Sequence, residues 1–210
     1  MIEADKITHK FNYRIIKRAF DIFFSTILIL ILSPLFFAIA MFVFLLNGYP
    51  FLYKWDVHGF KGKRFISYKF RTMVTNADSL KKGLQDFNEM SSVVFKIKDD
   101  PRITPFGKIL RKYSLDELPQ LFAILKGDMS FIGPRPSFPH EFEKFETLQK
   151  RKLSVIPGLS CLWQVSGRNK INNFDEWINL DLYYIDNWSL WLDIKIFFRT
   201  ILVVLKGTGT

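Results

Sequence analysis

The hydrophobic pattern is dominated by an uncharged apolar run, Ile22–Leu46, whose polar side chains are Ser25, Thr26 and Ser33. About 20 apolar residues are enough for a membrane-spanning helix. Pro34 lies at the midpoint of this run, where proline removes a backbone donor and clashes with the preceding turn. It also disfavours helical angles at the residue before it. The pattern therefore predicts a membrane-associated helix that is broken at Ser33-Pro34 into two halves of 12 residues each.

Basic residues flank the apolar run on both sides. They are Lys6, Lys10, Arg14, Lys17 and Arg18 before it, and Lys54, Lys61, Lys63 and Arg64 after it. Cytoplasmic flanks of membrane segments carry an excess of Lys and Arg. Each half of the run reaches only about 18 Å, which is short of a hydrocarbon core of about 30 Å. A helix that dips into the membrane and returns would place both flanks on the cytoplasmic side, and a kinked spanning helix is the alternative. A secretory signal peptide is disfavoured because the run is too long and no small-residue cleavage site follows it.

The segment Leu190–Lys206 is mostly apolar but is interrupted at intervals by charged residues, and Ser189 is available as its N-cap. This pattern favours a helix that lies in the membrane interface. Trp188 and Trp191 suit the headgroup boundary. An ordinary core helix with one charged face would show the same pattern.

The rest of the pattern predicts a mainly α fold with minor β content. Asn76–Phe87 is typical of a polar surface helix, and Arg64–Phe70 is typical of a short strand. A length of 210 residues accommodates one domain and a membrane element. We expect residues 1–50 to form a basic N-terminal segment and a membrane-associated helix, and residues 51–210 to form a compact domain.

Composition narrows the classes of ligand. A net charge of +10 suits anionic lipid headgroups or phosphate-bearing ligands, and the membrane segment argues against nucleic acid. Cys161 is the single cysteine, so no disulfide can form within the chain. The three histidines, His9, His58 and His140, are too widely spaced to indicate a zinc site.

Candidate chemistry is concentrated at Asp116 and Glu117, two adjacent carboxylates preceded by Lys108, Arg111 and Lys112. Adjacent carboxylates repel each other unless cations compensate. One interpretation is therefore a carboxylate nucleophile beside a proton-handling carboxylate, in a basic phosphate-binding site. The other is structural, because the segment from Ser114 to Glu117 also matches the S-x-x-E capping box at a helix start.

Further basic candidates lie in short motifs. Arg135 lies between Pro134 and Pro136, which fix the backbone and so present its planar guanidinium group rigidly. The others are Lys69, Arg71, Arg102 and Arg168. No G-x-x-x-x-G-K-[ST] or G-x-G-x-x-G motif occurs in the chain.

Taken in order, these segments resemble the bacterial sugar transferase family, the monotopic phosphoglycosyl transferases. The resemblance extends from about Phe11 to Lys206. The motifs that carry it are Lys17-Arg18-Ala19-Phe20-Asp21, Ser33-Pro34, Lys69-Phe70-Arg71-Thr72-Met73, Asp100-Pro101-Arg102-Ile103-Thr104, Leu110-Arg111, Ser114-Leu115-Asp116-Glu117-Leu118-Pro119-Gln120, Lys126-Gly127-Asp128-Met129-Ser130, Gly133-Pro134-Arg135-Pro136, Pro157-Gly158-Leu159, Trp163-Gln164-Val165-Ser166-Gly167-Arg168 and Leu180-Asp181.

The resemblance implies a monotopic enzyme of the bacterial cytoplasmic membrane. Residues 1–50 would contain a re-entrant membrane helix broken at Ser33-Pro34, with both of its ends cytoplasmic, and residues 51–210 would form the catalytic domain on the cytoplasmic face. It implies transfer of a sugar-1-phosphate from a UDP-sugar to a polyprenol phosphate such as undecaprenyl phosphate, with release of UMP. This is the first membrane step of exopolysaccharide, capsule or glycan assembly. Asp116 matches the nucleophile that carries the phosphosugar, and it also matches a ligand of the cofactor Mg²⁺. Glu117 matches the residue that deprotonates the acceptor phosphate.

The resemblance also implies roles for the basic motifs. Lys69 and Arg111 match residues that line the phosphate site, and Arg71 and Arg168 are further candidates for substrate binding. Arg135, with Pro134 and Pro136, falls in the element associated with the nucleotide. The exposed apolar surface permits a homodimer.

The chain departs from the family pattern at two positions before Gly59. Many members carry Gln and Arg where this chain has Trp55 and Val57. Larger members add spanning helices and a soluble domain ahead of this unit, so we expect the minimal catalytic form. Two competing hypotheses remain: a membrane-anchored scaffold or binding protein in which Asp116 and Glu117 only cap a helix, and a polytopic subunit in which Ile22–Leu46 spans fully.

Overall fold

The computed structural model describes residues 11–89, 94, 95, 97, 99–167, 171, 173–207 and 209. Within this part of the chain the fold is mainly helical with minor β content, as predicted. The α-helices are α2 (Phe11–Asn47), α3 (Ala77–Lys81), α4 (Pro105–Lys112), α5 (Leu121–Lys126), α6 (Pro139–Phe142), α7 (Thr147–Lys150), α8 (Leu162–Val165), α9 (Phe174–Asp186) and α10 (Leu190–Leu205). The 3₁₀-helices are η1 (Phe60–Gly62), η2 (Lys82–Phe87), η3 (Leu115–Gln120) and η4 (Arg151–Ser154). The strands are β1 (Leu52–His58), β2 (Arg64–Phe70), β3 (Ser130–Ile132) and β4 (Gly158–Ser160).

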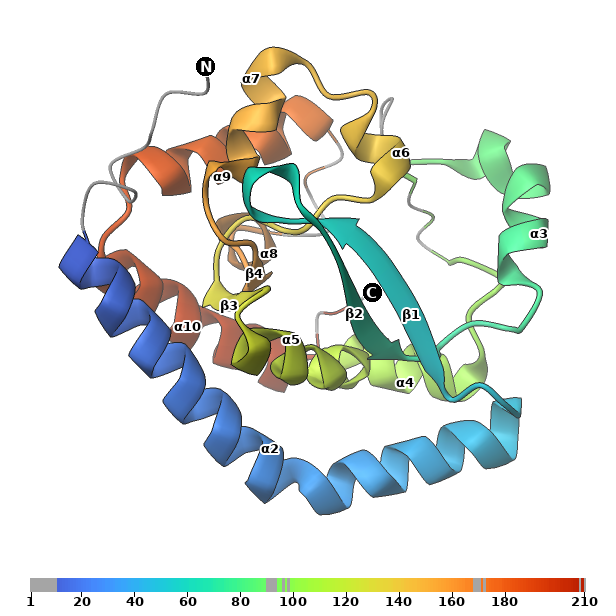
Figure 1. Cartoon of the computed structure of the whole chain (residues 1–210). Helices are drawn as coiled ribbons and strands as arrows, with labels where there is room; N and C mark the ends of the chain where they lie inside the picture. Colours follow the sequence, from blue (N-terminus) through green and yellow to red (C-terminus); the bar gives the residue numbers. More distant parts are fainter. Residues whose placement is uncertain are drawn as a thin grey trace.

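The long N-terminal helix α2 is bent, not broken. It runs without interruption from Phe11 to Asn47 with Pro34 inside it, and Figure 1 shows two arms joined at a bend. Pro34 has no N–H to donate to the Leu30 carbonyl, and the Ser33 hydroxyl donates to that carbonyl instead, at 2.9 Å. The prediction that Ser33 leaves the helix and separates two halves is therefore wrong. The serine side chain replaces the lost hydrogen bond, so the proline bends the helix without ending it.

The surface of α2 is largely apolar and exposed. Among the described residues, α2 is the one helix long and apolar enough to cross a membrane, over Tyr13–Asn47. Large apolar side chains such as Phe23, Leu30 and Phe37 stand on its exposed surface. This supports membrane association of α2, and whether the helix dips or spans stays a prediction.

The first arm of α2 is held to the rest of the molecule by the charged residues that precede the apolar run. Lys17 pairs with Asp193 of α10 at 2.5 Å. Arg18 donates to the carbonyls of Ile124 and Leu125 at the end of α5, both at 2.6 Å. The basic flank thus has a structural role within this arm.

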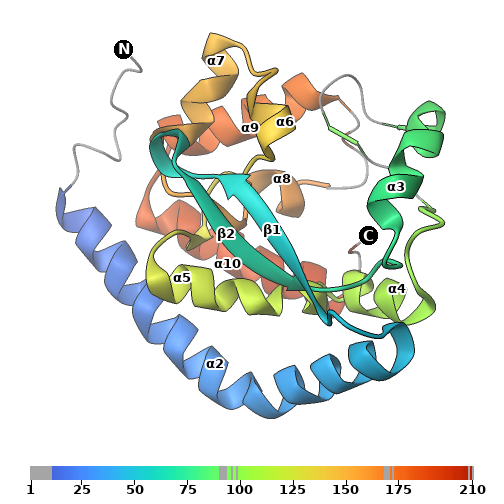
Figure 2. The same cartoon turned by 45° about the vertical axis from the view of Figure 1, so that its right-hand side comes forward.

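Asp21 completes this attachment. Its carboxylate accepts from the Ser130 hydroxyl at 3.1 Å and from the Phe131 backbone N–H at 3.0 Å, both on β3. Figures 1 and 2 both show α5 lying along the inner side of the bent helix, with α6, α7 and α9 at the opposite end of the molecule. The Lys17-to-Asp21 motif therefore fixes α2 on α5, β3 and α10, and the division into residues 1–50 and 51–210 stays a prediction.

The described strands form two small two-stranded sheets. β1 and β2 form an antiparallel hairpin in which Trp55 pairs with Ser67, and this confirms the strand predicted at Arg64–Phe70. β3 and β4 pair in parallel over two residues each. The main core lies between the hairpin and α9, where the Trp163 and Trp177 rings stack at 4.2 Å.

The last helix confirms one prediction and corrects another. α10 begins after Ser189, whose hydroxyl accepts from the Leu192 N–H as the predicted N-cap. Trp191 is 62% exposed, but Trp188 is only 3% exposed and donates to Asp193 at 3.1 Å. The prediction for Trp188 at a headgroup boundary is wrong, because its indole N–H has a buried carboxylate partner. The polar helix predicted at Asn76–Phe87 is present as α3 followed by η2.

Candidate active site

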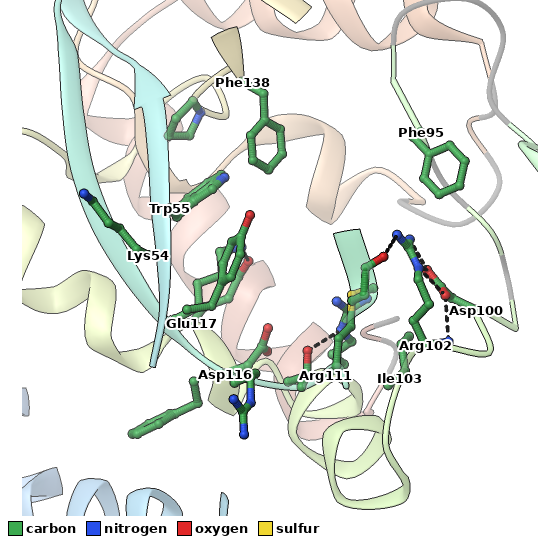
Figure 3. A pocket seen from close by; sticks show the side chains of 18 of the residues that line it. Lys54, Trp55, Phe95, Asp100, Arg102, Ile103, Arg111, Asp116, Glu117 and Phe138 are labelled. Atoms are coloured by element: carbon green, nitrogen blue, oxygen red, sulfur yellow. Dashed lines mark hydrogen bonds and ion pairs between the residues drawn. The ribbon is translucent and has the colours of Figure 1, made fainter. Parts of the chain in front are cut away.

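A cavity of about 850 Å³ lies beside the β1–β2 hairpin, and both candidate carboxylates line it. This is within the usual size range for small-molecule sites. Figure 3 shows Asp116 and Glu117 on one side, with Trp55 and Phe138 above them and Arg102 and Asp100 across the space. The predicted basic residues that line the same cavity are Lys69, Arg71, Arg102, Arg111 and Arg135.

Asp116 and Glu117 lie in the 3₁₀-helix η3. Ser114, just before it, adopts a left-handed conformation (φ 53°, ψ 25°) and its side chain makes no capping hydrogen bond. The capping-box interpretation of this segment is therefore wrong. Asp116 is 8% exposed and both carboxylates line the cavity, so the pair does not lie at the start of a solvated helix.

Lys69 brings a positive charge to this pair. It comes from β2, and its ammonium nitrogen lies 2.7 Å from Glu117 Oε1. The same nitrogen lies 4.1 Å from the centre of the Trp55 ring. Lys69 and Glu117 are therefore in direct contact and line the same cavity, although 48 residues separate them in sequence.

Arg111 reaches the cavity from α4. This helix begins with Thr104, whose hydroxyl accepts from the Gly107 N–H at 3.0 Å. A Cβ at Gly107 would lie 2.1 Å from the Thr72 carbonyl oxygen, so only glycine allows α4 to approach this closely. The approach lets the Arg111 Nε donate to the Thr72 hydroxyl at 2.9 Å.

Arg102 has a mainly structural role in the cavity wall. It forms an ion pair with Asp100 at 2.6 Å, and both side chains are buried. Burial acts to raise the pKa of Asp100, but the hydrogen bonds and charge of Arg102 outweigh it, so that the pKa lies below its ordinary value. Arg102 therefore closes one wall of the cavity with its charge already paired.

Arg135 enters from the far side on a rigid loop. Gly133 and Gly158 pack so closely that a Cβ at Gly158 would lie 2.1 Å from the Gly133 nitrogen. Pro134 and Pro136 are fully buried, and of these two Pro136 lines the cavity. The prolines thus hold the arginine as predicted.

Three aromatic rings surround the Arg135 guanidinium. Its central carbon lies 5.3 Å from the Trp177 ring, 5.7 Å from Phe138 and 5.8 Å from Trp55. The Glu141 carboxylate lies 3.7 Å from Nη1 of this guanidinium. Cation–π contacts at these distances hold a guanidinium in place without neutralising its charge.

The other two predicted binding residues have different outcomes. Arg71 is 6% exposed, and its Nη2 donates to the carbonyls of Asn47 and Gly48 at the end of α2. It lines the cavity but also fastens the membrane helix to β2. Arg168 lies outside the described residues, as do Lys6 and Lys10.

A buried ion pair behind the aromatic wall was not predicted as part of the site. Lys152 Nζ lies 3.1 Å from Asp181 Oδ2, and both side chains are almost fully buried. Burial raises the pKa of Asp181, and this effect outweighs the positive charges of Lys152 and Arg135, which act to lower the pKa. Burial and the Asp181 charge raise the pKa of the Cys161 thiol to about 12. The sequence signal for this pair was weak, because Lys152 belongs to none of the recognised motifs.

Comparisons with known proteins identify the family of this chain. The model of the bacterial sugar transferase family matches residues 12–207. The chain belongs to the bacterial sugar transferase family. This confirms the family resemblance that the ordered motifs indicated.

Relatives are similar over nearly the whole chain. It is 46% identical over 204 residues to the galactosyl transferase CpsE of Streptococcus agalactiae, covering 96% of this chain and 44% of that protein. It is 43% identical to the undecaprenyl-phosphate galactose phosphotransferase of Salmonella typhimurium, covering 95% and 42%. It is 38% identical to the exopolysaccharide production protein ExoY of Sinorhizobium fredii, covering 92% and 87%. The chain thus spans less than half the length of the first two relatives and most of the third.

The donor set in the cavity fits a magnesium ion that is shared with a substrate. Mg²⁺ in phosphate-handling enzymes is usually bound by one or two carboxylates together with substrate phosphates and water. Asp116 and Glu117 supply such oxygens. The described residues contain no group of three or more His, Cys, Asp or Glu side chains that could form a complete protein site. A metal held by the protein alone is thus not indicated for the described residues.

Proposed function

We propose that the protein transfers a sugar-1-phosphate from a UDP-sugar to a polyprenol phosphate, such as undecaprenyl phosphate, with release of UMP. The observation that carries this proposal is the placement of Asp116 and Glu117 in a cavity lined by Lys69, Arg111 and Arg135. Family membership and the names of the relatives agree with it. In this role the protein would act at the first membrane step of exopolysaccharide, capsule or glycan synthesis.

The first chemical step would use Asp116 as a nucleophile. One carboxylate oxygen attacks the β-phosphorus of the UDP-sugar, the bond from that phosphorus to the bridging oxygen breaks, and UMP leaves. The sugar phosphate is then held as an acyl phosphate on Asp116. Covalent catalysis of this kind divides one displacement into two easier steps.

The cations of the cavity would supply most of the rate enhancement. Phosphoryl transfer depends chiefly on positioning and on stabilising charge at the phosphoryl oxygens. Arg111 approaches from α4 and Lys69 from β2, so their charges reach the cavity from separate elements. In our proposal Arg135, which is held among aromatic rings, binds the nucleotide end of the UDP-sugar. Bound Mg²⁺ would neutralise part of the charge on the diphosphate, with Asp116 as its protein ligand.

The second step would return Asp116 to its starting state. Glu117 accepts a proton from the polyprenol phosphate, whose oxygen attacks the phosphorus of the acyl phosphate. The bond to Asp116 breaks and the polyprenyl diphosphate sugar leaves. Lys69 contacts Glu117 at 2.7 Å, so a positive charge is already placed where the acceptor phosphate would enter.

The position of α2 supports catalysis at a membrane surface. Arg71 ties the end of this helix to β2, the strand that carries Lys69. A lipid phosphate would therefore meet the cavity at a depth set by α2. In our proposal both ends of α2 lie on the cytoplasmic side of the bacterial inner membrane. Cysteines placed at positions 5 and 54 should then be labelled from the same face, and labelling from opposite faces would contradict the dip.

The assay that tests the function is UMP release from a panel of UDP-sugars with undecaprenyl phosphate and Mg²⁺. The names of CpsE and the Salmonella enzyme refer to galactose, and that of an Aeromonas hydrophila relative refers to N-acetylgalactosamine. UDP-galactose is therefore the first donor to test. Release of UMP with at least one donor, dependent on Asp116, is expected. A protein that binds UDP-sugars without releasing UMP would instead support the scaffold alternative.

A further inference from the structure

Trp55 is a feature of the site that the proposed mechanism does not use. It lies on β1 opposite Ser67 of β2, and Lys69 follows two residues further along β2. Diagonal neighbours across a hairpin share one face and are within reach of long side chains. The register therefore places the indole beside the Lys69 side chain at the edge of the cavity.

The contact between these two side chains is close. The Lys69 ammonium lies 4.1 Å from the centre of the Trp55 ring and 2.7 Å from Glu117 Oε1. A tryptophan face is the strongest cation–π partner among the side chains, within about 6 Å. The ammonium is thus held between an aromatic face and a carboxylate, and Figure 3 shows Trp55 and Glu117 on the same side of the cavity.

The indole uses its face and not its polar edge. Trp55 is 2% exposed, and its N–H has no hydrogen-bond partner within the described part of the chain. A buried donor without a partner lowers stability, so packing alone would be served better by a wholly apolar side chain. Val57, the neighbouring departure from the family pattern, is fully buried in the core and does not line the cavity.

We propose that Trp55 is a positioning residue that holds the Lys69 ammonium against Glu117 by a cation–π contact. This proposal rests on the proposed transfer function. Trp55 would affect transfer only by fixing the position of the Lys69 ammonium. Arg135 also approaches the Trp55 ring, but at 5.8 Å it lies near the limit of such contacts. The contact with Lys69 is therefore the dominant one.

A double-mutant cycle tests this assignment. Trp55→Leu should lower kcat/KM for transfer by roughly 5- to 30-fold, and Trp55→Phe, which keeps an aromatic face, should recover most of the loss. In a Lys69→Met background, Trp55→Leu should cause no further loss, because its effect passes through the lysine. In an Arg135→Ala control background the loss should remain. An equal loss with and without Lys69 would overturn the proposal, since it would show a direct or purely structural role.

A second measurement does not depend on activity. Lysines are reductively methylated with ¹³C, which keeps their charge, and the Lys69 signal is assigned by its absence in Lys69→Arg. Lys69 lies over an aromatic ring, so its methyl signal should be shifted upfield, and Trp55→Leu should remove the shift. An unshifted signal in the wild-type protein would overturn the proposal. A shifted signal in a protein that releases no UMP would refute the transfer function but support the contact.

Discussion

Arg18 is expected to be the main attachment of the membrane helix to the helix that follows the active-site carboxylates. Its guanidinium donates to the Ile124 and Leu125 carbonyls, both at 2.6 Å, and it covers Gly127, the left-handed residue that ends α5. Arg18→Ala removes both donors from carbonyls that have few other partners at a helix end.

The size of the effect follows from these two contacts. Hydrogen bonds to a charged group contribute about 1.5–3 kcal/mol each. Because the Arg18 side chain is only partly buried, we take the lower end and expect about 2–4 kcal/mol in total. For a chain of this size this corresponds to a fall in Tm of about 5–15 °C.

The assay is thermal unfolding of the purified protein in detergent micelles, with Arg14→Ala as the matched control. Arg14 lies one turn earlier on α2, and its guanidinium carbon lies 6.0 Å from the centre of the Phe60 ring. Arg14→Ala should change the Tm by no more than about 2 °C. Equal Tm values for the two variants would refute the view that Arg18 fastens α2 to α5.

Three further predictions concern the framework of the site. Gly107→Ala should abolish activity and lower expression, because the new Cβ would lie 2.1 Å from the Thr72 carbonyl oxygen; wild-type turnover would contradict this close approach. Asp100→Asn should destabilise the protein at neutral pH. The pKa of Asp100 is lowered in the fold, so its contribution is present above pH about 4 and is lost as the pH falls through the folded-state value. The free energies of unfolding of the two proteins, measured by urea titration, should therefore converge as the pH falls. A difference in unfolding free energy that stays constant with pH would refute this linkage. Cys161, whose buried thiol has a pKa of about 12, should resist a thiol reagent at pH 8 until the protein is unfolded, and rapid labelling of the native protein would contradict its burial.

Sequence patterns predicted well those features that depend on local periodicity or on residue order. The long apolar helix, the strand at Arg64–Phe70 and the N-cap at Ser189 all follow from local rules. The motif order indicated which carboxylates and cations belong together, and the cavity contains Asp116, Glu117 and Lys69.

Features that depend on tertiary partners could not be predicted in the same way. The bend at Pro34 depends on the hydroxyl of the residue before it, which replaces a hydrogen bond. Trp188 looked like an interfacial aromatic because its partner Asp193 appeared to belong to a solvated face. Arg71 lines the cavity as a substrate-binding candidate, but its motif does not indicate that its guanidinium also reaches the carbonyls at the end of α2, 23 and 24 residues earlier in the chain. Local pattern does not identify such distant partners.

The proposed chemistry depends most directly on whether Asp116 carries the phosphosugar. Protein incubated with a reactive UDP-sugar and Mg²⁺, but without polyprenol phosphate, is analysed by intact mass and by peptide mapping. We expect the mass of one sugar phosphate on the peptide that contains Asp116. The adduct should be absent in Asp116→Asn and should persist without transfer in Glu117→Gln after acceptor is added. Adduct formation in Asp116→Asn, or turnover of that variant at the wild-type rate, would contradict the central claim.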